Sequence, residues 1–497
     1  MSLKAQFTKV ADKPDTPIGP HGETALHLAA QGGDQNMARE ILAAGAAVHV
    51  TDQHNNTPAI YAALRGDAEM LMLLLRYDAS GIRHSGNSGT ALHAAVENGK
   101  IDAVHVALEF GADIDSLNGG DATPLHIAVR QRNLPMMEFL LARGADVNEG
   151  GNSGETPLHF AAAQGNMEML KLLFAHGAAS GLQLQVKQNR FTALEYAIGA
   201  GHEDAARYLV RQGALPGLVD ATGRTALHLA ATRDNPALAR MLVEEGYADL
   251  NKREENCTGS PLQAALYAGQ PATVRELVRL GADTMLTDAS GRNPLHIAAW
   301  IGSLSLVKYC VEELPAAENT QQSFANALYD AVFYEHVNVV QYLLKSGRVD
   351  PSLPNATGDT ALNAALLQTE QSVVVALLEA GADPLKPDKR GRTPLSFAVR
   401  RDNLALAKLL VTRGADVNAT CSEGSTPLFD AIANNDKEMV EFLLASGANP
   451  LARNSEDCTP CQFAQVEHLE SLAALLKKAE NDYVIKKTPQ KKQALSP

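Results

Sequence analysis

Apolar residues recur along the chain with helical spacing, and the spacing returns in pairs of short segments. Residues 158–163 (LHFAAA) form an Ala-rich segment, and residues 167–177 (MEMLKLLFAHG) carry apolar side chains three and four positions apart. Gly165 separates the two segments, and a second example of the longer one lies at 404–414 (LALAKLLVTRG). This pattern predicts two consecutive short helices with a glycine break between them.

A four-residue motif marks the start of each helix pair. Thr, Ser or Asn at its first place suits a helix N-cap, and proline, at the second place in eight of fourteen copies, suits the first helical turn. Successive copies are 33 to 36 residues apart, which predicts a repeat array. The copies begin at Thr24, Thr57, Thr90, Thr123, Thr156, Thr192, Thr225, Ser260, Asn293, Asn326, Thr360, Thr393, Thr426 and Thr459.

Each second helix is expected to end at a glycine followed by Ala-Asp. Gly144-Ala145-Asp146 and Gly414-Ala415-Asp416 are examples, and glycine there fits a left-handed helix stop. Polar connectors such as 146–155 (DVNEGGNSGE) then lead to the next copy.

These signatures, T-P-L-H, A-A, L-L and G-A-D, resemble those of the ankyrin repeat family over about residues 19–480. The resemblance implies an all-α ankyrin-repeat solenoid of helix-turn-helix units with short β-hairpin fingers. It also implies a concave face made of fingers and first helices. No catalytic residues come with this family, whose members in general bind other proteins.

The repeats divide the chain into four predicted parts. Residues 1–18 are polar and are expected to be a flexible segment, 19–314 hold repeats one to nine, and 315–480 hold repeats ten to fourteen with a cap helix at 468–480. Residues 481–497 are expected to be a flexible tail whose lysines form either a nuclear address or a solvated end. These lysines are Lys486, Lys487, Lys491 and Lys492.

Three places depart from the regular pattern. Residues 311–332 contain no Gly-Ala-Asp and no finger signature, so we expect a bend or a loosened joint near 311–325. The connectors 180–191 and 247–260 are enlarged, and their parts at 183–189 and 252–257 are expected to make secondary contacts with a partner.

Composition narrows the class of protein. The 497 residues carry a formal net charge of −14, which argues against a nucleic-acid groove as the main function. Aromatics make up 5%, so the core is expected to consist of Ala and Leu. The start of the chain has no apolar signal core, and there is no apolar run of about 18 residues. We expect a monomer in the cytoplasm, or also in the nucleus, with no membrane contact.

The five cysteines are an odd number and are scattered along the chain, so they do not look like a disulfide framework. This favours a reducing compartment. The cysteines are Cys257, Cys310, Cys421, Cys458 and Cys461. Cys458 and Cys461 form a C-x-x-C pair, but a zinc site needs four ligands, and Cys461 stands at the leucine place of its motif. Cys461 is therefore predicted to face the core, and no metal is expected.

Histidine fills the fourth place of six copies. The spacing of one repeat is too wide for a shared ion, so we interpret these residues as buried hydrogen-bonding groups that contact a neighbouring loop. They are His27, His93, His126, His159, His228 and His296. Catalytic motifs such as H-E-x-x-H, G-x-S-x-G and the phosphate-binding glycine loops are absent from the sequence, so we expect no enzyme activity and no cofactor.

The candidate site comes from the two residues that follow the pair of small residues near the end of each first helix. Most are small or polar, but copies eight to eleven carry Tyr267, Trp300, Phe333 and Leu367, with Ile301 and Tyr334 beside two of them. One interpretation is an aromatic surface on the concave groove that binds an extended or helical segment of another protein. The other is that these rings fill gaps around the irregular copy ten.

Arg400 and Arg401 follow along the same groove and can add a charged contact for an acidic segment. Two further function classes stay open. An aromatic groove can instead be a small-molecule pocket of an accessory protein in a biosynthetic pathway, and a secreted microbial effector has the same sequence features.

Overall fold

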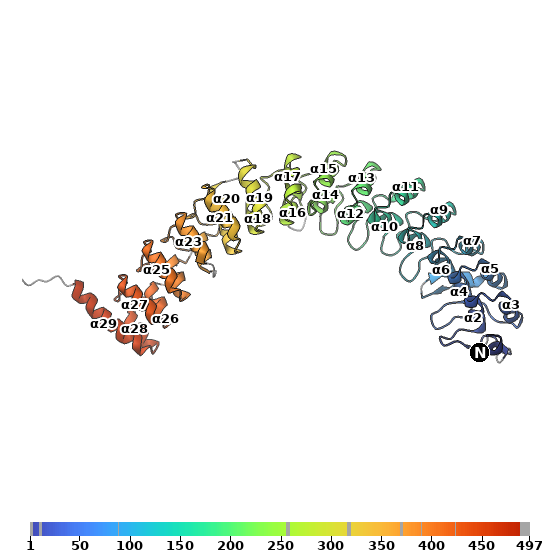
Figure 1. Ribbon diagram of the computed structural model, residues 1–497, viewed down its shortest axis with the longest axis horizontal. Coiled ribbons are helices and arrows are strands. Elements are labelled where there is room, and N and C mark those ends of the chain that lie inside the picture. Colours follow the sequence, from blue (N-terminus) through green and yellow to red (C-terminus); the bar gives the residue numbers. More distant parts are fainter. Residues whose placement is uncertain are drawn as a thin grey trace, which may run out of the picture. The chain divides into compact units, whose positions relative to one another are not determined.

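The computed structural model describes residues 3–8, 12–87, 89–254, 259–315, 320–367, 371–388, 390–422 and 424–487. Contacts within the chain divide it into two compact units. Unit 1 consists of Met1–Pro261 and Arg275–Ala282, and unit 2 consists of Leu262–Val274 and Asp283–Pro497. Helices stacked as successive pairs build each unit (Figure 1). The fold is therefore an all-α repeat solenoid, as the periodicity predicted.

In unit 1 the first helices of the pairs begin directly after the motif's first residue. They are α2 (Ala25–Gly32), α4 (Pro58–Arg65), α6 (Ala91–Glu97), α8 (Pro124–Arg130), α10 (Pro157–Gln164), α12 (Ala193–Ala200) and α14 (Ala226–Ala231). The second helices are α3 (Gln35–Ala43), α5 (Ala68–Tyr77), α7 (Ile101–Glu109), α9 (Leu134–Ala142), α11 (Met167–Ala175), α13 (Glu203–Arg211) and α15 (Pro236–Glu244).

In unit 2 the first helices are α16 (Pro261–Tyr267), α18 (Pro294–Trp300), α20 (Gln321–Phe333), α22 (Ala361–Leu367), α24 (Pro394–Arg400), α26 (Pro427–Ala433) and α28 (Pro460–Val466). The second helices are α19 (Leu304–Glu312), α21 (Val337–Lys345), α23 (Gln371–Glu379), α25 (Leu404–Thr412), α27 (Lys437–Ala445) and α29 (Glu470–Lys487). The first residue of α16, Pro261, belongs to unit 1, and the residues of α17 (Pro271–Arg279) are divided between both units.

First helices in the interior of the array, such as α8 and α10, are almost wholly buried because each packs against its own second helix and against the first helices on both sides. α10, for example, contacts α8, α11 and α12. Residues Pro124–Val129 of α8 are all buried, and the second helix α9 buries only one face, with Met136, Met137 and Leu140 fully covered. Small residues let these short helices approach closely, which explains the Ala- and Leu-rich composition.

The turn inside each pair needs a left-handed residue. Gly165 has φ 63° after α10, and its N–H bonds the carbonyls of Ala161 and Ala162. Arg132, Glu335 and Asp402 hold the same conformation, with φ near 60°, in copies without that glycine. A non-glycine residue pays a steric cost there, so the repeats tolerate strain at this turn.

The fingers contain little strand. Among the described residues, the only strands are β1 (Ser85–Gly86) and β2 (Gly89–Thr90), which form a short antiparallel hairpin, and one isolated bridge joins Pro354 to Thr360. The other described fingers are turns. Side chains close the turns instead: Asp52 Oδ1 accepts from the backbone nitrogens of His54 and Asn56 at 2.8 Å.

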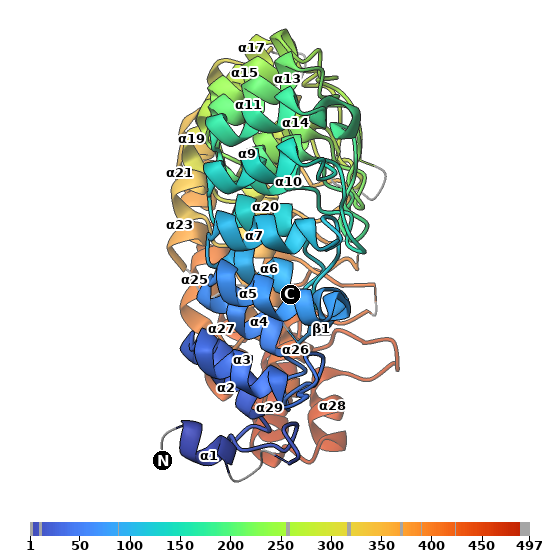
Figure 2. The same ribbon diagram turned by 90° about the vertical axis from the view of Figure 1, so that its right-hand side faces the viewer.

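Successive fingers also bond one another. The Lys187 nitrogen of the enlarged finger donates to the Ser153 carbonyl at 2.9 Å, and the Gln53 nitrogen donates to the His21 carbonyl at 2.9 Å. Figure 2 shows the fingers of unit 1 leaving the same side of its helix stack, opposite the second helices α7, α9 and α11. The fingers thus form a continuous row along the ends of the first helices.

Copy ten breaks this row. Its first helix, α20, has 13 residues and begins at Gln321, five residues before the motif residue Asn326. The side chain of Thr320 caps it by accepting from the Ser323 nitrogen at 3.1 Å. The chain just before copy ten is therefore helix where other copies have a finger. Residues 316–319 lie outside the described residues, and the predicted bend stays a prediction.

Both ends carry more helix than expected. α1 (Leu3–Thr8) forms within the segment 1–18, and α29 continues beyond the predicted cap at 468–480 to Lys487. Leu472 and Leu476 of α29 are fully buried against the last repeat, so this helix covers the end of the array. Lys491 and Lys492 lie outside the described residues, as do residues 255–258, including Cys257.

Candidate functional site

Trp300 lies at the centre of a row of aromatic rings drawn from three consecutive repeats. It is the last residue of α18, and its ring centroid lies 5.8 Å from that of Tyr267 and 5.8 Å from that of Tyr334. Both pairs are edge-to-face, with interplanar angles of 83° and 81°. Tyr267 ends α16 and Tyr334 follows α20, so the repeat period itself brings the rings together.

Phe333 extends the row on α20. Its ring lies 5.1 Å from that of Tyr334, and Tyr329, one helical turn earlier, stacks on it at 6.0 Å. We call Tyr267, Trp300, Phe333 and Tyr334 the aromatic row. Its inner members Tyr267 and Trp300 are half-buried, whereas Phe333 and Tyr334 are 40% and 46% exposed.

The other predicted apolar residues flank the row. Leu367 occupies the same helix-end place on α22 and is 40% exposed, and Ile301 is half-buried directly after α18. The place is not always polar elsewhere, since Leu64 on α4 and Val466 on α28 are exposed too. Among the described residues, aromatic rings at this helix-end place touch one another across repeats in copies eight to ten.

A finger residue that the sequence reasoning missed, Arg292, supports the row. Its guanidinium lies 4.9 Å from the ring centroid of Trp300 and 5.6 Å from that of Tyr267, within the range of cation–π attraction. It also donates to Asp288 Oδ2 at 2.9 Å, and the Tyr267 hydroxyl donates to the same oxygen. Burial raises the pKa of the Asp288 carboxyl, but these hydrogen bonds outweigh burial and hold it below its usual value.

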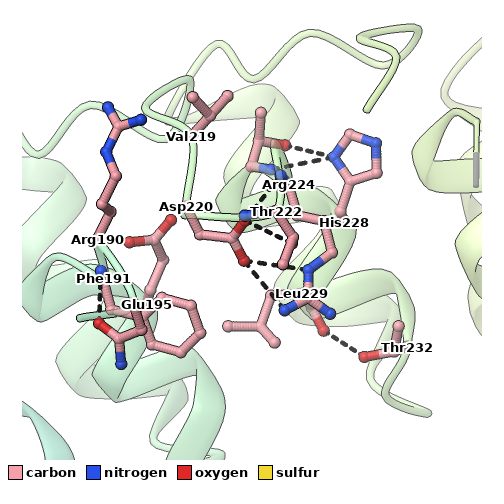
Figure 3. Close-up of polar contacts among 12 residues, drawn as sticks. Arg190, Phe191, Glu195, Val219, Asp220, Thr222, Arg224, His228, Leu229 and Thr232 are labelled. Carbon is pink, nitrogen blue, oxygen red and sulfur yellow. Dashed lines mark hydrogen bonds and ion pairs between the residues drawn. The ribbon is translucent and has the colours of Figure 1, made fainter. Parts of the chain in front are cut away.

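The aspartate–arginine pair is a recurring finger device. In copy seven, Asp220 accepts from Arg224 Nε at 3.1 Å and from Thr222, as Figure 3 shows. Asp388 and Arg392 form the same pair at 2.9 Å before α24. The D-x-x-G-R spacing of these fingers is the sequence signal that points to Arg292.

The two arginines predicted to continue the groove differ in their surroundings. Arg400 Nε donates to Asp430 Oδ1 on α26 at 3.0 Å, so this side chain already has an internal ion pair. Arg401, directly after α24, is exposed. Of the pair, Arg401 is the better placed for an external charge.

The enlarged finger 183–189 packs more closely than expected for a contact loop. Val186 is buried, and the side-chain nitrogen of Gln183 donates to the Gly213 carbonyl at 2.8 Å. Lys187 remains exposed. In the second connector residues 255–258 are not described, so the predicted contacts at 255–257 fall outside the described residues.

Five of the six motif histidines bond a neighbouring loop, as predicted. His126, 1% exposed, accepts at Nδ1 from the Thr123 nitrogen at 3.1 Å, and its Nε2 lies 2.7 Å from the Glu155 carbonyl of the next finger. His27, His93, His159 and His228 repeat this arrangement. Burial lowers the pKa of each, to about 4 for His159. Neutral imidazoles thus join each first helix to the finger that follows.

The structure also places the candidate metal residues. Cys461 is 3% exposed and faces the core, as its motif place predicted, while Cys458 is half-buried. Within the described part of the chain, no group of three or more His, Cys, Asp or Glu side chains is arranged to hold a metal ion.

A family model described as ankyrin repeats (3 copies) matches residues 5–84, 75–150, 148–220, 212–288, 262–355, 295–388, 347–421 and 397–487. The chain belongs to the ankyrin repeat family. The ankyrin repeat is a non-catalytic interaction fold, and its presence implies that the chain is a protein-interaction scaffold. None of the described ankyrin helices is long and apolar enough to cross a membrane.

Several known proteins match shorter parts of the chain. Protein PhlB of Serratia liquefaciens is 36% identical over 129 residues, 24% of this chain and 56% of PhlB. A transient receptor potential cation channel subfamily A member 1 homolog of Caenorhabditis elegans is 33% identical over 130 residues, 26% of this chain and 10% of its own. Neurogenic locus notch homolog protein 1 of Danio rerio is 32% identical over 125 residues, 25% of this chain and 5% of its own. The match spans about half of PhlB and a tenth or less of the other two.

Proposed function

We propose that this chain is a non-enzymatic scaffold that binds an extended or helical segment of another protein along the aromatic row. The observation that carries the proposal is the contact of Tyr267, Trp300 and Tyr334 across three repeats, with Phe333 and Tyr334 more than a third exposed. Large aromatic side chains are the favoured anchors of protein interfaces.

Size and surroundings support a segment as the ligand. Each aromatic side chain buries about 150–250 Å² when covered, so four neighbours offer more apolar surface than a lone exposed residue. The row runs across repeats instead of enclosing a cavity, which favours an elongated ligand over a small molecule. Arg401 supplies a charge farther along unit 2 that can set the direction of the segment.

The test is capture of partners by the full chain compared with a Trp300→Ala, Phe333→Ala, Tyr334→Ala variant. The matched control replaces three exposed apolar residues of unit 1, Tyr77→Ala, Leu215→Ala and Tyr247→Ala. Bound proteins are identified by mass spectrometry, and melting temperatures are measured for all three chains. We expect the control to keep every specific partner and the row variant to lose at least one without a change in melting temperature.

Two other results are informative. A row variant that melts early shows that the rings mainly fill the surroundings of copy ten. A row variant that keeps both its stability and its partners removes the row as the binding site. Because Trp300 is the only tryptophan in the chain, its fluorescence gives a second readout. A partner that covers the row shifts the emission, and one that binds elsewhere does not.

A further inference from the structure

A pocket of about 240 Å³ lies beside the first helices of unit 2, next to the place where residues 321–325 form helix instead of finger backbone. Two neighbouring fingers border it, and α18 and α20 form its floor. It is lined by Ser290, Gly291, Arg292, His296, Asn326, Asp330, Asn355, Ala356 and Thr357. A polar gap here is a consequence of α20 starting early, because every residue of α20 before Asn326 replaces finger backbone.

His296, which lines this pocket, lacks a hydrogen bond that the other motif histidines make. In the other motif histidines that the structure describes, Nε2 bonds a finger carbonyl, as His126 does with Glu155. His296 is only 6% exposed, yet its Nε2 has no hydrogen-bond partner among the described residues. Burial lowers the pKa of this imidazole to about 4, although the Ser323 backbone opposes the fall. The ring therefore brings no positive charge into the pocket at neutral pH.

Asp330 is the acidic group of the pocket. It lies on α20, one turn after Asn326 and one turn before Tyr334, and the structure gives its half-buried carboxyl no hydrogen bond or ion pair to a described residue. Burial raises the pKa of this carboxyl to about 6, and the nearby Arg292 lowers it only in part. Arg292 is already bonded to Asp288. A carboxylate held in this way lacks the partner that buried charges normally have.

The pocket adjoins the aromatic row. Arg292 lines the pocket and at the same time lies over the ring of Trp300. Asp330 lies on α20 four residues before Tyr334, the C-cap of this helix, so the two residues lie about one helical turn apart. A segment lying on the row therefore passes beside the pocket.

We propose that this pocket receives a lysine or arginine side chain of the segment bound by the aromatic row, and that its cationic group donates hydrogen bonds to Asp330. This inference rests on the proposed function. The partner then carries a basic residue close to an aromatic or aliphatic one. A carboxylate side chain of a partner is a poorer occupant, because Asp330 repels it and the charge of Arg292 is already compensated by Asp288.

The probe is a phage-displayed library of random twelve-residue peptides, selected on the full chain and on an Asp330→Asn variant. Glu379→Gln is the matched control, since Glu379 is an exposed carboxylate on α23 outside the pocket. We expect the native chain and the control to enrich peptides with Lys or Arg at a fixed spacing from an aromatic or aliphatic residue. Asp330→Asn is expected to lose the basic preference and to bind an enriched peptide at least tenfold more weakly.

The outcomes separate this inference from the proposed function. A basic preference that persists in Asp330→Asn, or a preference for acidic peptides, overturns the pocket assignment. In either case peptides that fail to bind the Trp300→Ala, Phe333→Ala, Tyr334→Ala variant still support the row. Peptides that bind this variant as well as the native chain overturn both, and so does a selection that enriches nothing on the native chain.

Discussion

The Glu195 carboxylate accepts a hydrogen bond of 2.6 Å from the backbone nitrogen of Thr192, in the place where other repeats hold a histidine. Glu195 is 3% exposed, and burial raises its pKa to about 7 from the usual 4.5. The unfolded chain therefore ionises this group more readily than the folded chain. Protonated Glu195 therefore contributes to the free energy of unfolding. This contribution is fully present below pH 4.5 and is lost as the pH rises through 7.

Glu195→Gln is expected to remove this pH dependence. At pH 8 the variant gains about 1–3 kcal/mol in free energy of unfolding, because the glutamine side chain is neutral, whereas near pH 4.5 the gain disappears. Copy eight offers a native precedent, since Gln263 at the same place donates to the Leu286 carbonyl at 2.8 Å. Urea unfolding at both pH values checks the prediction, with Glu138→Gln on the exposed side of α9 as control. Parallel pH profiles for native and Glu195→Gln chains would contradict it.

His159 gives the opposite pH response. Burial lowers the pKa of its imidazole to about 4 from 6.5, so the unfolded chain binds the proton first. Its stabilising contribution is present above pH 6.5 and is lost as the pH falls through 4. His159→Gln is expected to cost about 1 kcal/mol at pH 7, where it loses the edge-to-face packing with Tyr196, and to flatten the acid limb. Thermal melts between pH 4 and 7 measure both effects, and an unchanged acid limb counts against the assignment.

The sequence predicts most of this fold because local chemistry sets it. The N-cap residue Thr123, the proline after it and the buried His126 form one capping unit, and repetition of that unit gives the array. The early start of α20 is harder to foresee. Its N-cap, Thr320, lies six residues before the motif residue Asn326, so the motif pointed to the wrong helix start.

The site was predicted only in part for a related reason. Rings one repeat apart are visible in the sequence, so Tyr267, Trp300, Phe333 and Tyr334 could be named. Arg292 was missed although its D-x-x-G-R finger recurs, because its contact with the rings depends on how the finger folds over α18. Asp330 was missed because the early start of α20 was not foreseen. That Arg400 pairs with Asp430 was equally invisible, since the bond joins side chains 30 residues apart.

Two substitutions of Tyr267, to Phe and to Ala, distinguish the role of its ring from that of its hydroxyl. Tyr267→Phe keeps the edge-to-face contact with Trp300 but removes the hydrogen bond to Asp288. We expect about 1 kcal/mol lower stability and partner affinity within twofold of native, whereas Tyr267→Ala weakens both. Titration followed by Trp300 fluorescence gives the affinities. If Tyr267→Phe binds as weakly as Tyr267→Ala, the hydroxyl and not the ring is the contact.

Asp330 is expected to destabilise the free chain. Its pKa is raised from 3.8 to about 6, and Arg292 is the charged group that faces it, while His296 in the same pocket is neutral at this pH. The folded chain is more stable with the Asp330 carboxyl protonated, and this stability is lost as the pH rises from about 3.8 through 6. Asp330→Asn should therefore be more stable than the native chain by about 1–2 kcal/mol at pH 7.5 and equal to it near pH 4. Urea unfolding at the two pH values, with Glu379→Gln as control, measures the difference.

The same unfolding measurement tests whether the unpaired Asp330 carboxyl serves binding. A residue that lowers the stability of the free chain and raises it when a basic side chain is bound is typical of a binding site. Adding a basic peptide selected on the native chain should then stabilise the native chain more than Asp330→Asn. An Asn variant that is less stable at pH 7.5 would instead mean that the Asp330 carboxylate has an internal role in holding α20 to its neighbouring fingers.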